Sequence, residues 1–355
     1  MARLFSPLQL KGVTLKNRIV VSPMCQYSAV DGFANDWHMV HLGGFATGGS
    51  ALILVEATGV SPEARISPAD LGLWKDEQVA KHAEINAFLK KQGAVPGIQL
   101  AHAGRKGSTT VPWEGNEEVK PENGGWQTVA PSAVAYSERY PTPVALDEAG
   151  IAKVISDFKA ATKRAVDAGY EVIEVHASHG YLVHQFLSPL TNLRTDEYGG
   201  SFENRIRLLL EIVAAVQEVL PAELPLFVRI PGTDWAEGGW SPEDASRLAQ
   251  VLKDKGVDVM DVTSGGLVRE QQIAVGPAYQ TPFAAKVKRE TGACTSTAGL
   301  ITNAVQAESI LVNGEADLIM IARELLRDPH FPLRAAHELK AEVDWPLQYE
   351  RAKWD

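Results

Sequence analysis

The sequence predicts a single (β/α)8 barrel, the TIM-barrel class of α/β fold, in which eight parallel strands alternate with eight helices. Eight short runs rich in branched apolar residues are separated by eight longer stretches with helical spacing. Connections leading into the strands are short, as at Lys255-Gly256, whereas several of those leaving them are long. A chain of 355 residues is an ordinary length for one such barrel, so we expect one domain spanning residues 1–355.

Each element can be assigned in order along the chain. Residues 3–16 predict a small N-terminal β-hairpin that turns at Lys11-Gly12. The predicted barrel strands are Ile19–Val21, Leu52–Glu56, Val95–Leu100, Val172–Val175, Leu226–Ile230, Val257–Thr263, Thr295–Ala298 and Asp317–Ile321. The predicted helices are 37–48, 77–92, 147–168, 203–220, 242–255, 281–291, 303–313 and 330–341. A doubly wound open sheet is disfavoured, because it normally carries G-x-G-x-x-G after its first strand and that position here is SPMCQYSA.

Two further segments stand apart from this alternation. Residues 102–146 follow the third strand, are rich in Gly, Pro and Glu, and begin with the motif HAGRKG. Barrels of this class build their sites from loops at the carboxyl ends of the strands, so we interpret the segment as an excursion over the barrel mouth. Residues 342–355 form a C-terminal tail beyond the last predicted helix.

Composition excludes several classes of partner. The chain carries 34 basic and 44 acidic residues, a net charge of −10, which disfavours nucleic acid and anionic membranes as ligands of its general surface. Its two cysteines, Cys25 and Cys294, are too few for a disulfide scaffold or a four-cysteine iron–sulfur cluster. The sequence contains neither a signal-peptide core nor a run of membrane-spanning length, and we expect a soluble cytoplasmic protein.

The densest cluster of chemical groups follows the fourth predicted strand. Within six residues the chain presents His176, His179 and Tyr181, separated by small residues that permit a turn. Because polar groups at the carboxyl end of a barrel strand face a pocket, we expect the two imidazoles and the phenol to converge there.

Other strand ends suggest a bound cofactor. Gly299 follows the seventh strand and Arg323 the eighth, where barrels often bind a phosphate; alternatively, Arg323 pairs with an acidic neighbour such as Asp328. Gln99 can both donate to and accept from the pyrimidine edge of a planar ring, and Arg229 can hold negative charge on that edge. FMN fits this set, although these residues alone admit other ligands.

Six segments together resemble the Old Yellow Enzyme family, in particular its thermophilic-like, or xenobiotic-reductase-like, branch of ene-reductases. They are SPMCQYSA (22–29), DWHMVHL (36–42), VEATGVSPEARI (55–66), IQLAHAGRK (98–106), HASHGYLVHQFLSPLTNLRTDEYGGSFENR (176–205) and IARELLRDPHF (321–331). The resemblance implies a TIM barrel that binds FMN at its mouth. It also implies an NADPH dehydrogenase of the ene-reductase type, which uses NADPH or NADH to reduce C=C bonds conjugated to carbonyl or nitro groups.

The resemblance also assigns roles residue by residue. It implies that the cofactor is bound by Ser22, Pro23, Met24, Cys25, Ala57, Gln99, His176 and Arg229 around the ring system and by Gly299, Ala322 and Arg323 at the phosphate. The family usually has glycine at position 322, so Ala322 is a departure. Cys25 would tune the flavin's redox potential rather than act as a nucleophile.

On the substrate side, the resemblance implies that Tyr27, His176, His179 and Tyr181 face an activated alkene. The two histidines would donate hydrogen bonds to the substrate oxygen, and Tyr181, or else water, would protonate the α-carbon. The ending QYERAKW suggests that Arg351 reaches into the site of a neighbouring subunit, and therefore a homodimer or homotetramer.

Three alternatives remain open at this stage. Cys25, His176 and His179 are a possible zinc set for a metal-dependent lyase or hydrolase, although no carboxylate partner for them is evident. The others are a non-catalytic flavin-binding protein and a longer dienoyl-CoA reductase relative. Outside the site, we expect His38, His41 and His82 to be partly exposed residues on helices.

Overall fold

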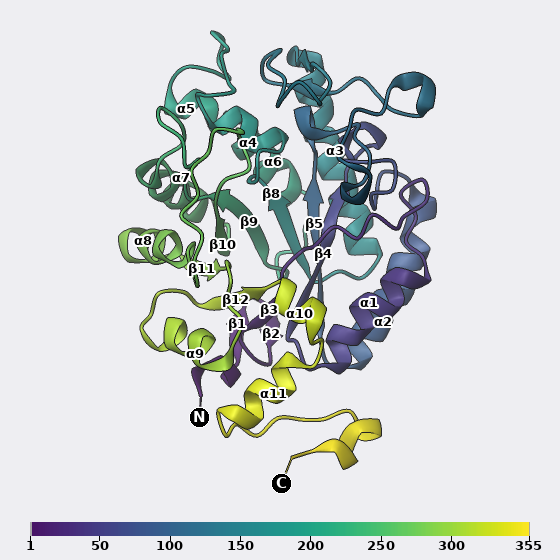
Figure 1. Cartoon of the computed structure of the whole chain (residues 1–355), viewed down its shortest axis with the longest axis vertical. Helices are drawn as coiled ribbons and strands as arrows, with labels where there is room; N and C mark the ends of the chain where they lie inside the picture. The colour runs from purple at the N-terminus through teal and green to yellow at the C-terminus, as the bar shows by residue number, and fades with distance from the viewer. Residues whose placement is uncertain (1, 355) are drawn as a thin grey trace.

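The structure, a computed structural model, describes residues 2–354 and contains a closed barrel of eight parallel strands, which confirms the predicted fold class (Figure 1). The barrel strands are β3 (Ile19–Val21), β4 (Leu52–Gly59), β5 (Val95–Ala101), β8 (Val172–His176), β9 (Leu226–Pro231), β10 (Val259–Thr263), β11 (Cys294–Thr297) and β12 (Leu318–Ile321). They neighbour one another in this order, and β12 closes the barrel by pairing Ile321 with Val21 of β3. Each of the eight predicted runs therefore forms a strand.

The helices alternate with these strands as predicted. They are α1 (Asp36–Thr47), α2 (Val79–Lys91), α3 (Glu148–Asp167), α5 (Phe202–Arg205), α6 (Arg207–Gln217), α7 (Pro242–Asp254), α8 (Thr281–Thr291), α9 (Ala304–Val312) and α11 (Phe331–Glu338). The single helix expected over 203–220 is divided into α5 and α6 at Ile206. Two short helices, α4 (Leu182–Leu187) and α10 (Arg323–Arg327), were not predicted, and each lies just beyond the carboxyl end of a strand.

The N-terminal hairpin fixes which end of the barrel is open. It forms as predicted from β1 (Leu8–Leu10) and β2 (Val13–Leu15). Its apolar residues join one buried cluster with alternate residues of the barrel strands, among them Leu52, Val172 and Phe227. The hairpin therefore closes the amino-terminal end of the barrel, and the carboxyl ends of the strands are left to form a site.

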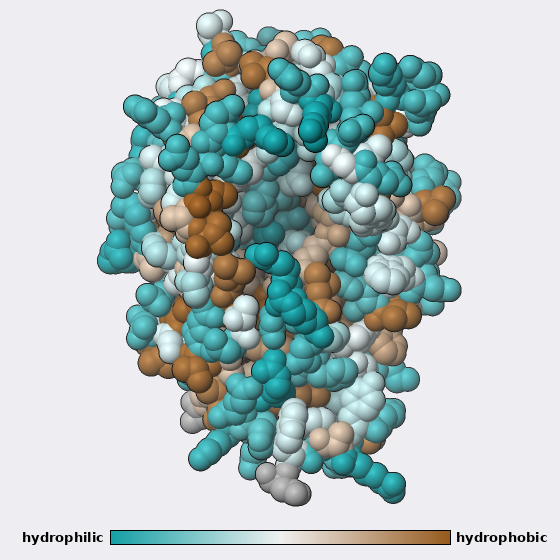
Figure 2. All heavy atoms as spheres, in the orientation of Figure 1, coloured by the Kyte–Doolittle hydropathy of each residue, from teal (hydrophilic) through white to brown (hydrophobic). Residues whose placement is uncertain are grey.

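Segment 102–146 contains three short 3-10 helices and a two-stranded parallel sheet. The helices are η4 (Gly104–Lys106), η5 (Pro112–Glu114) and η6 (Pro121–Asn123), and the strands are β6 (Val129–Ala130) and β7 (Val144–Ala145). Arg194, in the loop after α4, fixes the second half of the segment by donating to the carbonyl oxygens of Pro131 at 3.1 Å and Leu146 at 2.5 Å. Figure 2, which has the orientation of Figure 1, shows a hollow near the middle of the face toward the viewer, with hydrophilic residues on its floor.

The remaining elements lie at the ends and in the loops. They are the 3-10 helices η1 (Arg3–Phe5), η2 (Pro62–Ala64), η3 (Asp76–Gln78) and η7 (Leu347–Ala352). The tail that carries η7 lies at the end of the molecule opposite α4 and α5 (Figure 1). Among the described helices, none has the length and apolar character needed to cross a bilayer.

Candidate active site

The turn after β8 brings His176, His179 and Tyr181 together. Strand β8 ends at His176, and the chain then reverses through two left-handed residues, His179 with φ 55° and Gly180 with φ 75°. The ring centre of His176 lies 5.2 Å from that of His179 and 5.1 Å from that of Tyr181. The convergence expected from the sequence is therefore present.

Both imidazoles are neutral hydrogen-bonding groups. Burial lowers the pKa of His176 well below its ordinary value, and His179 and Arg229 lower it further. Burial likewise lowers the pKa of His179, helped by Arg229 and Lys106. Nδ1 of His176 accepts from the Ser178 backbone N–H at 3.3 Å, so the ring's proton is on Nε2, which lies 3.4 Å from Nδ1 of His179. The pair can thus offer N–H donors without carrying positive charge.

The backbone N–H and C=O groups of this turn form hydrogen bonds with side chains that the sequence analysis did not assign to the site. The Gly180 N–H donates to Nδ1 of His184 at 2.9 Å, and the Gly180 carbonyl accepts from Gln185 at 2.8 Å. Lys106 donates to the carbonyl oxygens of His179 at 2.9 Å and of Gly266 at 3.0 Å. A Cβ on Gly180 would lie 2.1 Å from the Gly266 oxygen, so only glycine fits there.

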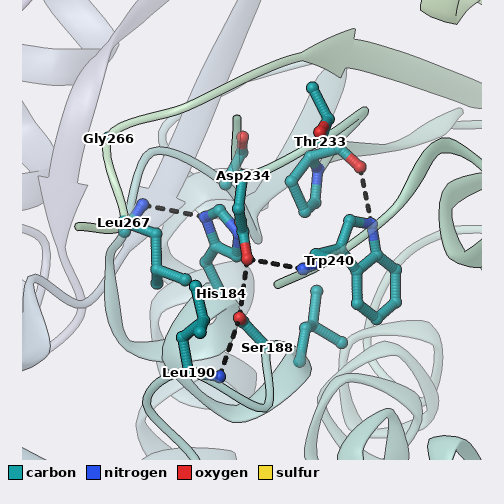
Figure 3. Close-up of polar contacts among 12 residues, drawn as sticks. His184, Ser188, Leu190, Thr233, Asp234, Trp240, Gly266 and Leu267 are labelled. Atoms are coloured by element: carbon teal, nitrogen blue, oxygen red, sulfur yellow. Dashed lines mark hydrogen bonds and ion pairs between the residues drawn. The ribbon is translucent and has the colours of Figure 1, made fainter. Parts of the chain in front are cut away.

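A buried histidine–aspartate pair supports the turn from behind, as Figure 3 shows. His184 Nε2 lies 2.7 Å from Oδ1 of Asp234, and both side chains are fully buried. Ser188 Oγ and the Trp240 backbone N–H donate to Oδ2 of the same carboxylate at 2.6 and 2.7 Å. Asp234 therefore holds the proton of His184 on Nε2 and keeps Nδ1 free to accept from Gly180.

Lys106 links the turn to the excursion. Its ammonium group lies 5.0 Å from the ring centre of Tyr181 and 4.8 Å from that of Tyr136. Burial, helped by Arg105, lowers the pKa of Lys106 to about 7. The sequence offered a signal for this residue, since the HAGRKG motif directly follows the third barrel strand.

Replacing Lys106 by Met is expected to change how stability depends on pH. A lysine whose pKa is lower in the folded protein than in the unfolded chain contributes stability that is fully present above the unfolded-chain pKa. This stability is lost as the pH falls through the folded-state pKa, which is about 7 for Lys106. From pH 7 to 9 the wild type should therefore gain about 1–2 kcal/mol of unfolding free energy relative to Lys106→Met. Urea unfolding of both proteins at the two pH values measures this gain, and parallel pH dependences would contradict it.

The floor of the mouth carries a buried polar network. Gln99 Nε2 donates to Glu174 at 2.7 Å, and Arg229 contacts Glu174 at 3.5 Å, bonds Asp261 through Nε and donates to Ser22 at 3.2 Å. Burial raises the pKa of Glu174 to about 8, opposed by Arg229. Burial lowers the pKa of Arg229, but Asp261 and Glu174 outweigh it and raise that pKa overall, so the guanidinium stays charged.

This network fits the pyrimidine edge of a flavin. Within residues 2–354, neither Nη1 of Arg229 nor the side-chain amide oxygen of Gln99 makes a hydrogen bond. This leaves one charged donor and one acceptor at the floor. A flavin ring edge presents both kinds of partner. The sequence interpretation identified Gln99 and Arg229 but not their carboxylate partners, Glu174 and Asp261.

The residues after β3 and on β4 line the side of the mouth. Ser22 is buried, whereas Pro23, Met24, Cys25 and Tyr27 are half-buried. Burial, together with Asp70 and Glu56, raises the pKa of Cys25 well above its usual value, so the side chain is a thiol rather than a thiolate.

Two neighbouring residues complete this wall. Ala57 is buried where the β4–β5 register shifts between Val55 and Thr58. Tyr27 adopts φ 50° and meets the Trp113 ring edge-on with ring centres 5.8 Å apart.

Gly299, Tyr279 and Arg323 form a candidate phosphate cradle. Gly299 has φ 108°, and a Cβ there would lie 2.9 Å from the Tyr279 ring. Burial raises the pKa of Tyr279 and the positive charge of Arg323 opposes that rise, which indicates that the guanidinium lies near the phenol. Ala322 precedes α10, so its position can contribute a backbone N–H without a glycine.

The alternative pairing of Arg323 with Asp328 is wrong. Asp328 instead bonds Arg334 at 2.9 Å, and among residues 2–354 Arg323 makes no ion pair. Its guanidinium is exposed and remains free to bind an anion.

Replacing Arg323 by Ala should weaken FMN binding by roughly 10- to 100-fold, because a hydrogen bond to a charged group contributes about 1.5–3 kcal/mol. Fluorescence titration of the apoprotein with FMN measures the dissociation constant. Arg327→Ala is the matched control, since Arg327 lies on the same helix, is exposed and pairs with Glu324 at 2.9 Å. Equal losses in both variants would contradict a specific role for Arg323.

Arg351 was expected to act in a neighbouring subunit, and it is exposed in η7. The zinc set of Cys25, His176 and His179 is not assembled, since within residues 2–354 no group of three or more His, Cys, Asp or Glu side chains is arranged to hold a metal ion.

The expectation that His38 and His82 are partly exposed is wrong, because each is only 1% exposed. Nδ1 of His38 accepts from the Asn35 backbone N–H at 3.1 Å in a helix cap, and its Nε2 lies 3.3 Å from Glu56. His82 contacts the Tyr170 hydroxyl at 2.7 Å. The expectation failed because helical spacing in the sequence does not reveal that both faces of these two helices are covered by other elements. His41, on the same helix as His38, is half-buried as expected.

Comparison with known proteins agrees with this geometry. Residues 3–342 match the model of the NADH:flavin oxidoreductase / NADH oxidase family. The chain is 47% identical over 350 residues to an NADPH dehydrogenase of Geobacillus thermodenitrificans, covering 98% of both chains. It is 49% identical over 354 residues to one of Listeria welshimeri, covering 99% of both.

Solved structures extend the same relationship. Morphinone reductase has a TM-score of 0.81 and 29% identity, covering 97% of this chain and 91% of its own, and its complex with tetrahydroNAD has a TM-score of 0.79. The chain is an oxidoreductase with FMN as its cofactor and a reduced nicotinamide nucleotide as its reductant. It belongs to the NADH:flavin oxidoreductase / NADH oxidase family, the Old Yellow Enzyme family.

Proposed function

We propose that this protein is an ene-reductase that reduces C=C bonds conjugated to a carbonyl or nitro group. The observation that carries the proposal is the pair of neutral, converging imidazoles beside a phenol at the end of β8. FMN held by these residues would supply hydride transfer from the reduced nicotinamide nucleotide to the substrate's β-carbon. The relatives named NADPH dehydrogenase and morphinone reductase support this chemistry.

His176 and His179 bind the substrate oxygen in this proposal. Hydride addition at the β-carbon moves negative charge onto the carbonyl or nitro oxygen, so fixed N–H donors favour the transition state over the ground state. The bonds that Lys106 and His184 make to the turn hold these donors in place before the substrate arrives. Preorganised donors in a buried site stabilise a developing oxyanion more strongly than water does.

Tyr181 supplies the second hydrogen, as a proton to the α-carbon. Burial raises the pKa of its phenol well above the usual value, and the neighbouring Cys25 and Tyr27 raise it further. The hydroxyl therefore stays protonated throughout the neutral range. A phenol with a high pKa still protonates a carbanion-like carbon, because the carbon is the stronger base.

The proposal also includes the cofactor contacts. Ser22–Cys25, Ala57, Gln99, His176 and Arg229 would hold the ring system, and Gly299, Ala322 and Arg323 would hold the phosphate. Tyr27 faces the substrate. Arg351, exposed in η7, acts in the site of a second copy in a homodimer or homotetramer under this proposal.

Anaerobic stopped-flow spectroscopy tests the proposal. The holoenzyme is first reduced with NADPH and then mixed with cyclohexenone, a nitroalkene, or the corresponding saturated compounds. We expect rapid reoxidation of the flavin by the two activated alkenes only, with the saturated ketone or nitroalkane as product. A flavin that stays reduced with both alkenes, and is reoxidised only when oxygen is admitted, would refute the proposed activity.

A further inference from the structure

A buried carboxylate that the reaction above does not use shares a cavity with Tyr181. Asp70 is 2% exposed and lies in the loop after η2. Its Oδ1 accepts from the backbone N–H and the hydroxyl of Ser67 at 3.1 and 2.7 Å, and its Oδ2 accepts from the Ile66 backbone N–H at 2.8 Å. These bonds fix the carboxyl group in place.

The cavity has room for one water molecule. It has about 10 Å³ of space for the centre of a water molecule and is lined by Asp70, Tyr181 and small or apolar residues of β4, β5 and the segments that follow these two strands. A volume of this size holds a single water when polar groups face it. Asp70 is also among the groups whose charge raises the pKa of the Tyr181 phenol, and both residues line this cavity.

We propose that Asp70 is the proton reserve for Tyr181 and recharges it through one water held in the cavity that they share. The inference rests on Tyr181 as the donor to the α-carbon. Once the phenol O–H has given its proton to carbon, the phenolate takes a proton from the water. The water in turn takes one from the Asp70 carboxylic acid, so each O–H bond broken is matched by one formed. Bulk water restores the acid between turnovers.

The protonation state of Asp70 suits this task. Burial raises its pKa to about 7, the bonds from Ser67 and Ile66 oppose the rise, and the nearby carboxylate of Glu56 adds to it. An acid with this pKa keeps a proton at neutral pH and releases it readily. The titratable groups that face it are Glu56 on β4, Cys25 and Tyr27 after β3, Arg65 on its own loop, and Tyr181.

The test compares four variants of the holoenzyme by steady-state turnover of cyclohexenone with saturating NADPH, from pH 6 to 9, in H2O and D2O, because Tyr181 must be recharged once in every turnover. Asp70→Asn removes the acid, and Ala101→Val fills the cavity without touching Asp70. Both should slow turnover at pH 6 by at least about tenfold, because Tyr181 must regain its proton before the next substrate is reduced. In the wild type the rate should fall above pH 7; in Asp70→Asn it should be independent of pH near 7, with a larger solvent isotope effect.

Lys106→Met and Tyr181→Phe separate the possible causes. Lys106 also has a pKa of about 7 and lies near Tyr181. The fall in rate above pH 7 must therefore persist in Lys106→Met. If that fall disappears in the variant, the lysine causes it and the proposal is overturned. If Tyr181→Phe has no effect, the proposed proton donor fails. If Tyr181→Phe is slow but Asp70→Asn and Ala101→Val match the wild type, only the relay fails.

A measurement on the unaltered holoenzyme guards against misfolding of Asp70→Asn, whose amide has one acceptor oxygen where the carboxylate uses two. Infrared difference spectra should contain a protonated-carboxyl band at pH 6 that disappears above pH 8, persists in Ala101→Val and is missing from Asp70→Asn, whereas the band of Glu174, whose pKa is about 8, is present in all three proteins. If that band is absent at pH 6, Asp70 holds no proton to give, and the proposal is overturned.

Discussion

Replacing His176 by Ala is expected to lower kcat for cyclohexenone by roughly 100- to 1,000-fold, the loss typical of removing one oxyanion donor from a preorganised site. The imidazole is neutral and its proton is on Nε2, so the variant removes a hydrogen bond rather than a charge. Hydride transfer then places negative charge on an oxygen with one donor fewer. Steady-state kinetics and single-turnover reoxidation of the flavin both measure the effect.

The pH dependence provides a second readout for the same residue. Because burial keeps the pKa of both histidines well below the ordinary value, neither should change its charge between pH 6 and 8. Their contribution to the rate should therefore be constant over that range. His337→Ala is the matched control, an exposed histidine on α11 that should leave kcat unchanged. A His176→Ala enzyme with wild-type kcat would exclude an oxyanion role.

The barrel and its strand-end residues could be predicted because their signals are local. A strand buried on both faces is a continuous apolar run, and the polar residue that ends it, such as His176 or Arg229, is adjacent in sequence. Eight such runs suffice to give the fold. Helices α4 and α10 have six and five residues, too few for an apolar repeat to be recognised.

The supporting residues could not be predicted because their partners are distant in sequence. His184 and Asp234 are 50 positions apart, and Lys106 and Gly266 are 160 apart. Which buried polar groups meet depends on the arrangement of the loops, which periodicity does not encode. The same reason explains Asp70, whose relation to Tyr181 exists only through a shared cavity.

Asp234 is expected to be the most costly of these supporting residues to replace. Asp234→Ala leaves His184, Ser188 and the Trp240 backbone N–H without their shared acceptor in a fully buried site. Unsatisfied buried donors cost about 1–3 kcal/mol each, and breaking a buried pair costs about 3–5 kcal/mol. We expect the unfolding free energy to fall by about 3–5 kcal/mol, measured by urea denaturation. Asp254→Ala, an exposed carboxylate on α7, should change it by less than about 0.5 kcal/mol.

The effect of Asp234 on catalysis should follow from the tautomer of His184. Without the carboxylate, the His184 proton can move to Nδ1, which can then no longer accept from the Gly180 N–H. The turn that carries His179 loses that bond, so kcat should fall although Asp234 touches no substrate. Asp234→Asn keeps an oxygen that accepts from the His184 Nε2–H, so its kcat should be much closer to the wild-type value than that of Asp234→Ala. It should still be less stable than the wild type, because the Trp240 N–H and the Ser188 hydroxyl lose their carboxylate acceptor. Stability and kcat that fall in strict proportion across both variants would reduce Asp234 to a purely structural role.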